Sequence, residues 1–128
     1  GELSLSLVAE KDGQVVGHIA LSPVTISDGS TGWFGVGPIS VLPGYQGQGI
    51  GAALMHAALD ALRGQGAQGC VVLGEPSYSG RFGFHADPGL VLPGVPAAYF
   101  QALSLVPPIA QGEVRYSAAF EASAPPVD

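Results

Sequence analysis

Hydrophobic and polar residues alternate at the start of the chain with the two-residue period of half-buried strands. Residues 3–10 place leucine or alanine at every second position, and residues 15–26 form a second run that is rich in β-branched residues. Between them lies Asp12-Gly13, a typical hairpin turn. After a polar loop at residues 28–32, residues 33–42 form a third apolar run. The pattern predicts a β-hairpin followed by a third strand.

The period then changes to that of a helix, over residues 49–64. Ile50, Leu54, Ala58 and Leu62 recur every four residues, and glycines at positions 64 and 66 supply a stop. Residues 69–73 are continuously apolar, as expected for a strand that is buried in the interior of a sheet. Strand, helix and buried strand together predict a βαβ crossover.

The rest of the chain is punctuated by proline. We expect a short helix at residues 97–102, closing strands at residues 103–106 and 114–120, and a frayed tail at residues 122–128. The expected fold class is α/β, with a mixed, partly antiparallel sheet and one long helix. Residues 1–121 would form this single domain.

The composition of the chain argues against a membrane span and against a nucleic-acid partner. The 128 residues are 47% hydrophobic and 11% charged, and no apolar run is long enough to span a membrane. Four lysines and arginines against ten acidic residues give a formal charge of −6, which argues against a nucleic-acid surface and favours cationic partners such as amines. The single cysteine, Cys70, lies in the apolar strand and is expected to be a buried packing residue. We expect a cytoplasmic protein.

A glycine-rich loop precedes the predicted helix and is the main candidate site. Glycines at a helix start let a ligand approach the backbone, and the unpaired N–H groups of the first turn form an anion site. The loop lacks the Lys-Ser/Thr pair of a triphosphate-binding P-loop. Its residues Gln46-Gly47-Gln48-Gly49-Ile50-Gly51 fit Gln/Arg-x-x-Gly-x-Gly/Ala. This pattern resembles the pyrophosphate-binding motif of the GNAT acyl-CoA N-acyltransferases.

A second motif, at residues 71–84, makes the resemblance more specific. A strand, the turn Gly74-Glu75-Pro76-Ser77-Tyr78 and a closing Arg-Phe-Gly-Phe are similar to the second half of the GNAT core. The Gly-x-Pro-x-Tyr spacing resembles the YhbS-like bacterial subgroup of that family. The resemblance covers roughly residues 3–120, and the strand and two helices that open the family fold are not found in this chain.

The resemblance implies a co-substrate and a reaction. Acetyl-CoA would bind along the backbone of Ile39, Ser40 and Val41, and its pyrophosphate would lie against the loop from Gln46 to Ala52, which includes Gly47, Gln48, Gly49, Ile50 and Gly51. The acetyl group would pass by direct attack to a primary amine on a small molecule or a protein. An apolar surface left by the missing part of the fold would suit a homodimer. No membrane or nucleic-acid partner and no metal is expected.

The catalytic residues are less well defined by the sequence. Family members often place a Tyr four residues before the Gly of the closing Gly-Phe, where it protonates the leaving thiolate. That position is Ser79 here, and Tyr78 lies one residue earlier. Because a phenol is a stronger acid than an aliphatic hydroxyl, we assign the role of general acid to Tyr78. Glu75, at the end of the buried strand, is the first candidate for the general base, and Glu10 is the second.

Two other interpretations stay open. Gly47-x-Gly49-x-x-Ala52 also fits a dinucleotide fingerprint, with Glu75 near the place of a ribose-binding acid. That fingerprint should follow its strand directly in an opening βαβ unit, whereas here a hairpin comes first. The other interpretation is a non-catalytic CoA-binding or regulatory module, which the unusual Ser79 would suit.

Overall fold

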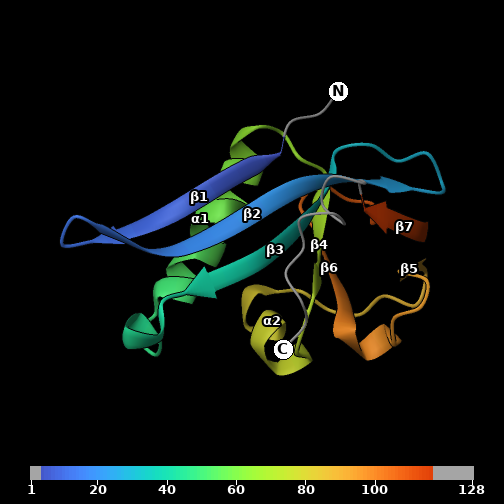
Figure 1. The fold of residues 1–128 in the computed structure, drawn as a ribbon. Coiled ribbons are helices and arrows are strands. Elements are labelled where there is room, and N and C mark those ends of the chain that lie inside the picture. The colour runs from blue at the N-terminus through green and yellow to red at the C-terminus, as the bar shows by residue number, and fades with distance from the viewer. Residues whose placement is uncertain (1–3, 117–128) are drawn as a thin grey trace.

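The protein folds around one mixed sheet of seven strands, with a single long helix on one face (Figure 1). We describe residues 4–116 of a computed structural model. The strands are β1 (Leu5–Lys11), β2 (Gln14–Ile26), β3 (Trp33–Val41), β4 (Gly69–Leu73), β5 (Leu90–Val91), β6 (Phe100–Ser104) and β7 (Gly112–Tyr116). The helices are α1 (Ile50–Gly64) and α2 (Pro76–Ser79), with 3₁₀ turns η1 (Pro43–Tyr45), η2 (Gly80–Phe82) and η3 (Ala97–Tyr99). The sheet order is β5-β7-β2-β3-β4-β6, and β1 pairs with β2.

The predicted hairpin is confirmed. β1 and β2 pair antiparallel, and Lys11 lies opposite Gln14 across a two-residue turn. Asp12 and Gly13 both have positive φ, 53° and 77°, as the tight turn between twisted strands requires. β3 then pairs antiparallel with β2. The predicted βαβ crossover is also confirmed, because β4 lies parallel to β3 with α1 between them in the chain.

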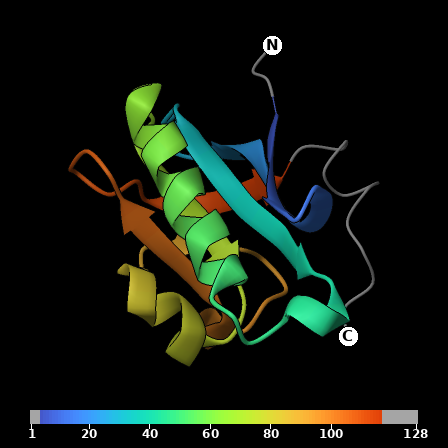
Figure 2. The same cartoon turned by 90° about the vertical axis from the view of Figure 1, so that its left-hand side faces the viewer.

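Helix α1 covers β1, β2 and β3 through its apolar stripe (Figure 2). The predicted four-residue spacing is confirmed, because the buried residues of the helix are Leu54, Met55, Ala58, Leu59 and Leu62. Within the described residues, no helix is long and apolar enough to cross a membrane.

Strand β4 is buried on both faces, as its continuous apolar run predicts. Cys70 and Val72 belong to the core beneath α1, whereas Val71 belongs to a second core on the opposite face with Trp33 and Phe100. Burial raises the pKa of the Cys70 thiol to about 12, so it stays protonated and acts as a packing residue, as expected.

The prediction of a helix at residues 97–102 is wrong. Only η3 (Ala97–Tyr99) forms one turn there, and β6 already begins at Phe100. Pairing with β4 overrides the local helical preference, since Phe100 lies opposite Leu73 and buries its ring in the second core. Strand β7 (Gly112–Tyr116) begins before the predicted strand at residues 114–120, whose last four residues lie outside the described range, as does the predicted tail at 122–128.

Strand β3 pairs with β4 only over the first part of its own length. Their pairing extends from Trp33 and Gly69 to Val36 and Val72, after which β3 continues to Val41 without β4 (Figure 1). A bulge lies at the point of separation: the register of β2 and β3 steps from Ile19–Ile39 to Leu21–Val36, so that two β3 residues face one of β2. Bulges bend a strand and increase its twist, which turns the end of β3 away from β4.

The start of the β3–β4 pairing depends on Gly69. A Cβ at this position would overlap the ring of Trp33, whose side chain is only 2% exposed. We therefore expect Gly69→Ala to lower the free energy of unfolding by about 1–3 kcal/mol, as overpacking of a rigid core does. Urea denaturation followed by circular dichroism measures the change.

The matched control is Gly64→Ala, at the end of α1, where an added Cβ meets no atom within 4 Å. Alanine is the better helix former, so this variant should be at least as stable as the parent chain. Equal stabilities of the two variants would contradict the assignment of Gly69 as a packing constraint.

Candidate functional site

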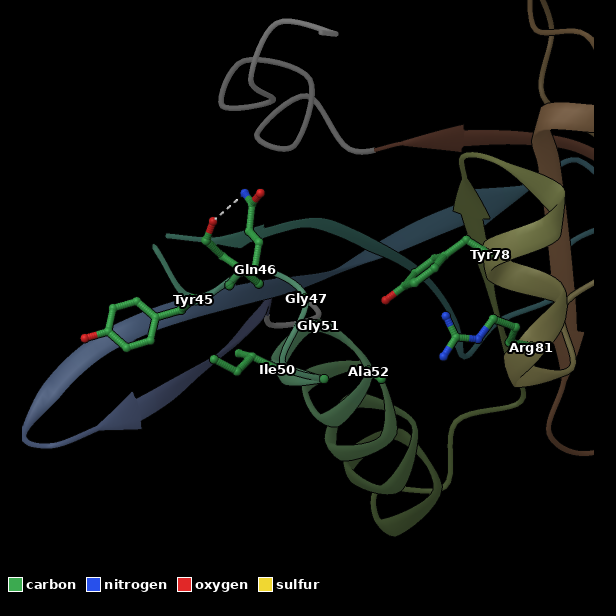
Figure 3. A pocket seen from close by; sticks show the side chains of 10 residues that line it. Tyr45, Gln46, Gly47, Ile50, Gly51, Ala52, Tyr78 and Arg81 are labelled. Atoms are coloured by element: carbon green, nitrogen blue, oxygen red, sulfur yellow. Dashed lines mark hydrogen bonds between the residues drawn. The ribbon is translucent and has the colours of Figure 1, made fainter. Parts of the chain in front are cut away.

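A cavity of about 380 Å³ lies where α1 begins, between the end of β3 and the α2–η2 segment (Figure 3). Three parts of the chain line it: the end of β3 with the glycine loop, the first turn of α1, and α2 with η2. The lining residues are Val41, Tyr45, Gln46, Gly47, Gly49, Ile50, Gly51, Ala52, Tyr78 and Arg81. Seven of the ten predicted cofactor-binding residues are among them, whereas Ile39, Ser40 and Gln48 are not.

The glycine loop presents a row of free backbone donors. Gly47 and Gly49 have φ values of 78° and 82°, and a Cβ at either would meet no atom within 4 Å, so the loop is open on that side. The first amide of α1 that is paired is that of Ala53, which donates to Gly49. No described residue accepts a hydrogen bond from the N–H groups of residues 47–52. Together with the positive end of the α1 dipole, such donors are the groups that favour an anion.

The charges of the cavity fit an anion as well. None of its ten lining residues is acidic, although the chain carries a formal charge of −6. Arg81 supplies a cation, and its guanidinium lies 5.4 Å from the ring centre of Tyr78 and 5.8 Å from that of Phe82. The sequence prediction did not include Arg81 among the site residues. Its signal was available, since it is one of only four lysines and arginines and lies within the second motif.

The separated end of β3 offers backbone groups on its open edge. Leu42 donates its N–H to Val16 of β2. In an antiparallel ladder the direction of the backbone groups alternates, so those of Val41 and Ile39 point away from β2, toward the side that β4 has left, whereas Ser40 faces its β2 partner His18. On this edge the carbonyl of Val41 accepts a 3.0 Å hydrogen bond from Nε2 of Gln46.

The tip of the β1–β2 hairpin holds the other side of the glycine loop. Nζ of Lys11 donates to Oε1 of Gln48 at 2.9 Å and lies 5.9 Å from the ring centre of Tyr45. The hydroxyl of Tyr45 donates a long hydrogen bond, 3.5 Å, to Oε1 of Gln14. The side chain of Gln48 is thus engaged with the hairpin, whereas its backbone N–H has no acceptor among the described residues.

The side chain of Tyr78 reaches across the cavity to α1. Its hydroxyl oxygen lies 3.2 Å from the position that a Cβ on Gly51 would occupy, so glycine in the first turn permits this approach (Figure 3). The ring stacks edge-on against Phe82 at 5.4 Å. The structure therefore brings Tyr78 and Arg81 to the glycine loop, from which both are distant in the sequence.

Two other predicted residues lie outside the cavity lining. Glu75 is exposed at the N-cap of α2, where its backbone carbonyl accepts the N–H groups of Tyr78 and Ser79. Glu10, the second candidate for the base, is exposed on β1. Ser79 is 3% exposed and its hydroxyl donates to Oε1 of Gln101 at 2.7 Å, so it belongs to the interior. In the described residues, no cluster of His, Cys, Asp and Glu could hold a metal ion.

This chain belongs to the acetyltransferase (GNAT) family, whose model matches residues 2–81. The match includes the glycine loop and the second motif as far as Arg81. Together with the antiparallel hairpin ahead of β3, it weighs against a dinucleotide-binding domain. The mixed, partly antiparallel sheet with one long helix is the fold that the resemblance implied.

Known proteins of this family are similar over most of the chain. It is 39% identical over 104 residues to the uncharacterized N-acetyltransferase YhbS of Escherichia coli K12, a match covering 77% of this chain and 62% of that protein. The chain thus spans about three-fifths of this curated relative.

Two similar crystal structures contain a ligand. A GNAT acetyltransferase from Brucella melitensis, in complex with acetyl-CoA, is 53% identical with a TM-score of 0.76, and the match covers 90% of this chain and 67% of that one. YhbS from Escherichia coli, in complex with CoA, is 35% identical with a TM-score of 0.83, over 91% and 68% of the two chains.

Proposed function

We propose that this protein is an N-acetyltransferase that binds acetyl-CoA in the cavity at the start of α1 and transfers the acetyl group to a primary amine. The observation that carries the proposal is the row of free N–H groups at residues 47–52 in a cavity that has Arg81 and no acidic lining residue. The CoA complexes of the two similar family members support it.

Different residues of the cavity bind different parts of CoA. The N–H groups of the glycine loop donate to the pyrophosphate, and Arg81 adds a positive charge on the opposite wall. The outward backbone groups of Ile39 pair with the amide-rich pantetheine arm as a further strand would. Gln46 fixes the end of β3 to the loop through the Val41 carbonyl.

Acetyl-CoA supplies the thioester. A neutral amine attacks its carbonyl carbon, a C–N bond forms, the C–S bond breaks, the amine loses a proton and the thiolate gains one. The N–H of Val41, directed to the open edge of β3, stabilises the negative charge on the carbonyl oxygen. Tyr78 donates the proton to the thiolate and regains one from solvent.

We propose that a water molecule carries the proton from the attacking amine to a base outside the cavity. No carboxylate or imidazole lines the cavity, so Glu75 acts as base through a bridging water from the N-cap of α2. The acceptor is a small-molecule or protein amine, in keeping with the acidic chain. The alternative function, a CoA-binding module without turnover, is favoured by one observation, the buried Ser79 in place of the family tyrosine.

Binding is tested by calorimetric titration with CoA and with NAD. The chain should bind CoA in preference to NAD, and Gly49→Val should weaken CoA binding at least about tenfold, or about 1.4 kcal/mol. Gly49 is the N-cap of α1 with a φ of 82°, which a β-branched residue strongly disfavours, so the loop N–H groups would no longer converge. Gly44→Val is the matched control, because Gly44 has open space around it and does not line the cavity. Normal CoA binding by Gly49→Val would show that the pyrophosphate does not bind at the glycine loop.

Turnover is tested by thiol release from acetyl-CoA with a panel of small amines and lysine peptides. We expect turnover, and we expect Tyr78→Phe to lower kcat about 10- to 1000-fold with little change in the KM for acetyl-CoA, because the ring stays and only the proton donor is lost. Tight CoA binding without turnover for any amine would instead favour the non-catalytic module. Full activity of Tyr78→Phe would remove Tyr78 from the chemistry.

A further inference from the structure

A buried polar pair lies beneath the segment that carries Tyr78 and Arg81. Ser79 is 3% exposed and Gln101, on β6, is 1% exposed. The Ser79 hydroxyl donates to Oε1 of Gln101 at 2.7 Å, and the same hydroxyl lies 3.2 Å from the carbonyl oxygen of Glu75. Buried polar groups are costly unless they are paired, so this bond holds α2 against the sheet.

Gln101 connects three parts of the chain at this point. Its Nε2 donates to the carbonyl oxygen of Gly74, at 3.3 Å, and to that of Ala98. Its Oε1 accepts from Ser79. A single amide side chain therefore ties together the turn after β4, the short helix α2 and the turn η3. All of its hydrogen-bonding groups are used within the protein.

The segment formed by α2 and η2 is not stabilised by its own secondary structure. Helix α2 has four residues, Gly80 follows it, and Gly83 closes η2 with a φ of 96°. Helices this short are not stable alone. Tyr78 is 38% exposed and no described residue hydrogen-bonds its hydroxyl, so its direction depends on how the backbone of α2 is held.

We propose that Ser79 and Gln101 are positioning residues that hold α2 so that the Tyr78 hydroxyl faces the first turn of α1. The proposal rests on the proposed function, because it concerns the orientation of the general acid. In this proposal Ser79 acts indirectly. It occupies the position of the family's tyrosine, and its buried hydrogen bond fixes the backbone that carries Tyr78. Neither positioning residue touches the substrate.

The test is a double-mutant cycle of Ser79→Ala and Tyr78→Phe, measured by acetyl-CoA thiol release. Ser79→Ala alone should lower kcat about 10- to 100-fold, the effect of misplacing a catalytic group, while the KM for acetyl-CoA changes less than about twofold. In the Tyr78→Phe background it should have almost no further effect, because the group that it positions is gone. Gln101→Met, which keeps the side-chain length but removes the three bonds, should behave in the same way.

Two controls separate positioning from loss of fold. Ser77→Ala makes the same change at the exposed neighbour on α2 and should leave kcat unchanged. Val114→Ala weakens the second core, away from the cavity, and should lower the melting temperature without lowering kcat at 25 °C. An unchanged kcat for Ser79→Ala, or an equal loss in the Tyr78→Phe background, would overturn the proposal.

A second readout does not require turnover. The chain has four tyrosines, so selective ¹³C labelling gives four ring signals, and the signal lost in Tyr78→Phe identifies Tyr78. That signal should shift in Ser79→Ala and Gln101→Met, whereas that of Tyr45 should stay. If the parent chain released no thiol, the proposed function would be wrong. A shift of the Tyr78 signal in these variants would still support the proposal that Ser79 and Gln101 position Tyr78. An unmoved Tyr78 signal would overturn the positioning alone.

Discussion

The separation of β3 from β4 is the constraint on which the site depends. The two strands share hydrogen bonds only as far as Val36 and Val72, and the bulge in β3 directs its last residues away. The glycine loop and α1 follow β3 in the chain, and the segment that carries Tyr78 and Arg81 follows β4. The cavity lies between these two ends, and a fully paired sheet would have closed it.

Each wall of this opening contributes a different kind of interaction. The β3 side offers backbone donors, because its glycines leave the N–H groups of residues 47–52 unpaired. The β4 side offers side chains, a phenol and a guanidinium, held in place by the buried Ser79–Gln101 bond. The first wall suits phosphate groups, and the second adds the positive charge of Arg81 and the hydroxyl of Tyr78. This division explains why a GNAT family chain with few basic residues can present a site for an anionic ligand.

Local patterns in the sequence predicted most of the fold and part of the site. The hairpin, α1 and β4 follow from periodicity, and the glycine loop follows from its motif. The helix expected at residues 97–102 was wrong because pairing of Phe100 with Leu73 is a long-range contact that no local pattern contains. Gln101 was missed for the same reason, whereas Arg81 was missed although its charge is rare in this sequence. Each acquires its role only when β4 and β6 bring α2 to the start of α1, and a single sequence without alignment gives no sign of that contact.

We propose that the unpaired backbone groups of the cavity bind the co-substrate. The most direct test of this proposal is a titration of the ¹⁵N-labelled chain with CoA, followed by amide NMR. We expect large shifts for the amides of Gly47, Gly49 and Gly51 and for those of Ile39 and Val41. The shift of Ser40 should be smaller, because its amide faces β2. Shifts confined to the separate cavity around Thr25 and Glu113, with the glycine loop unchanged, would contradict it.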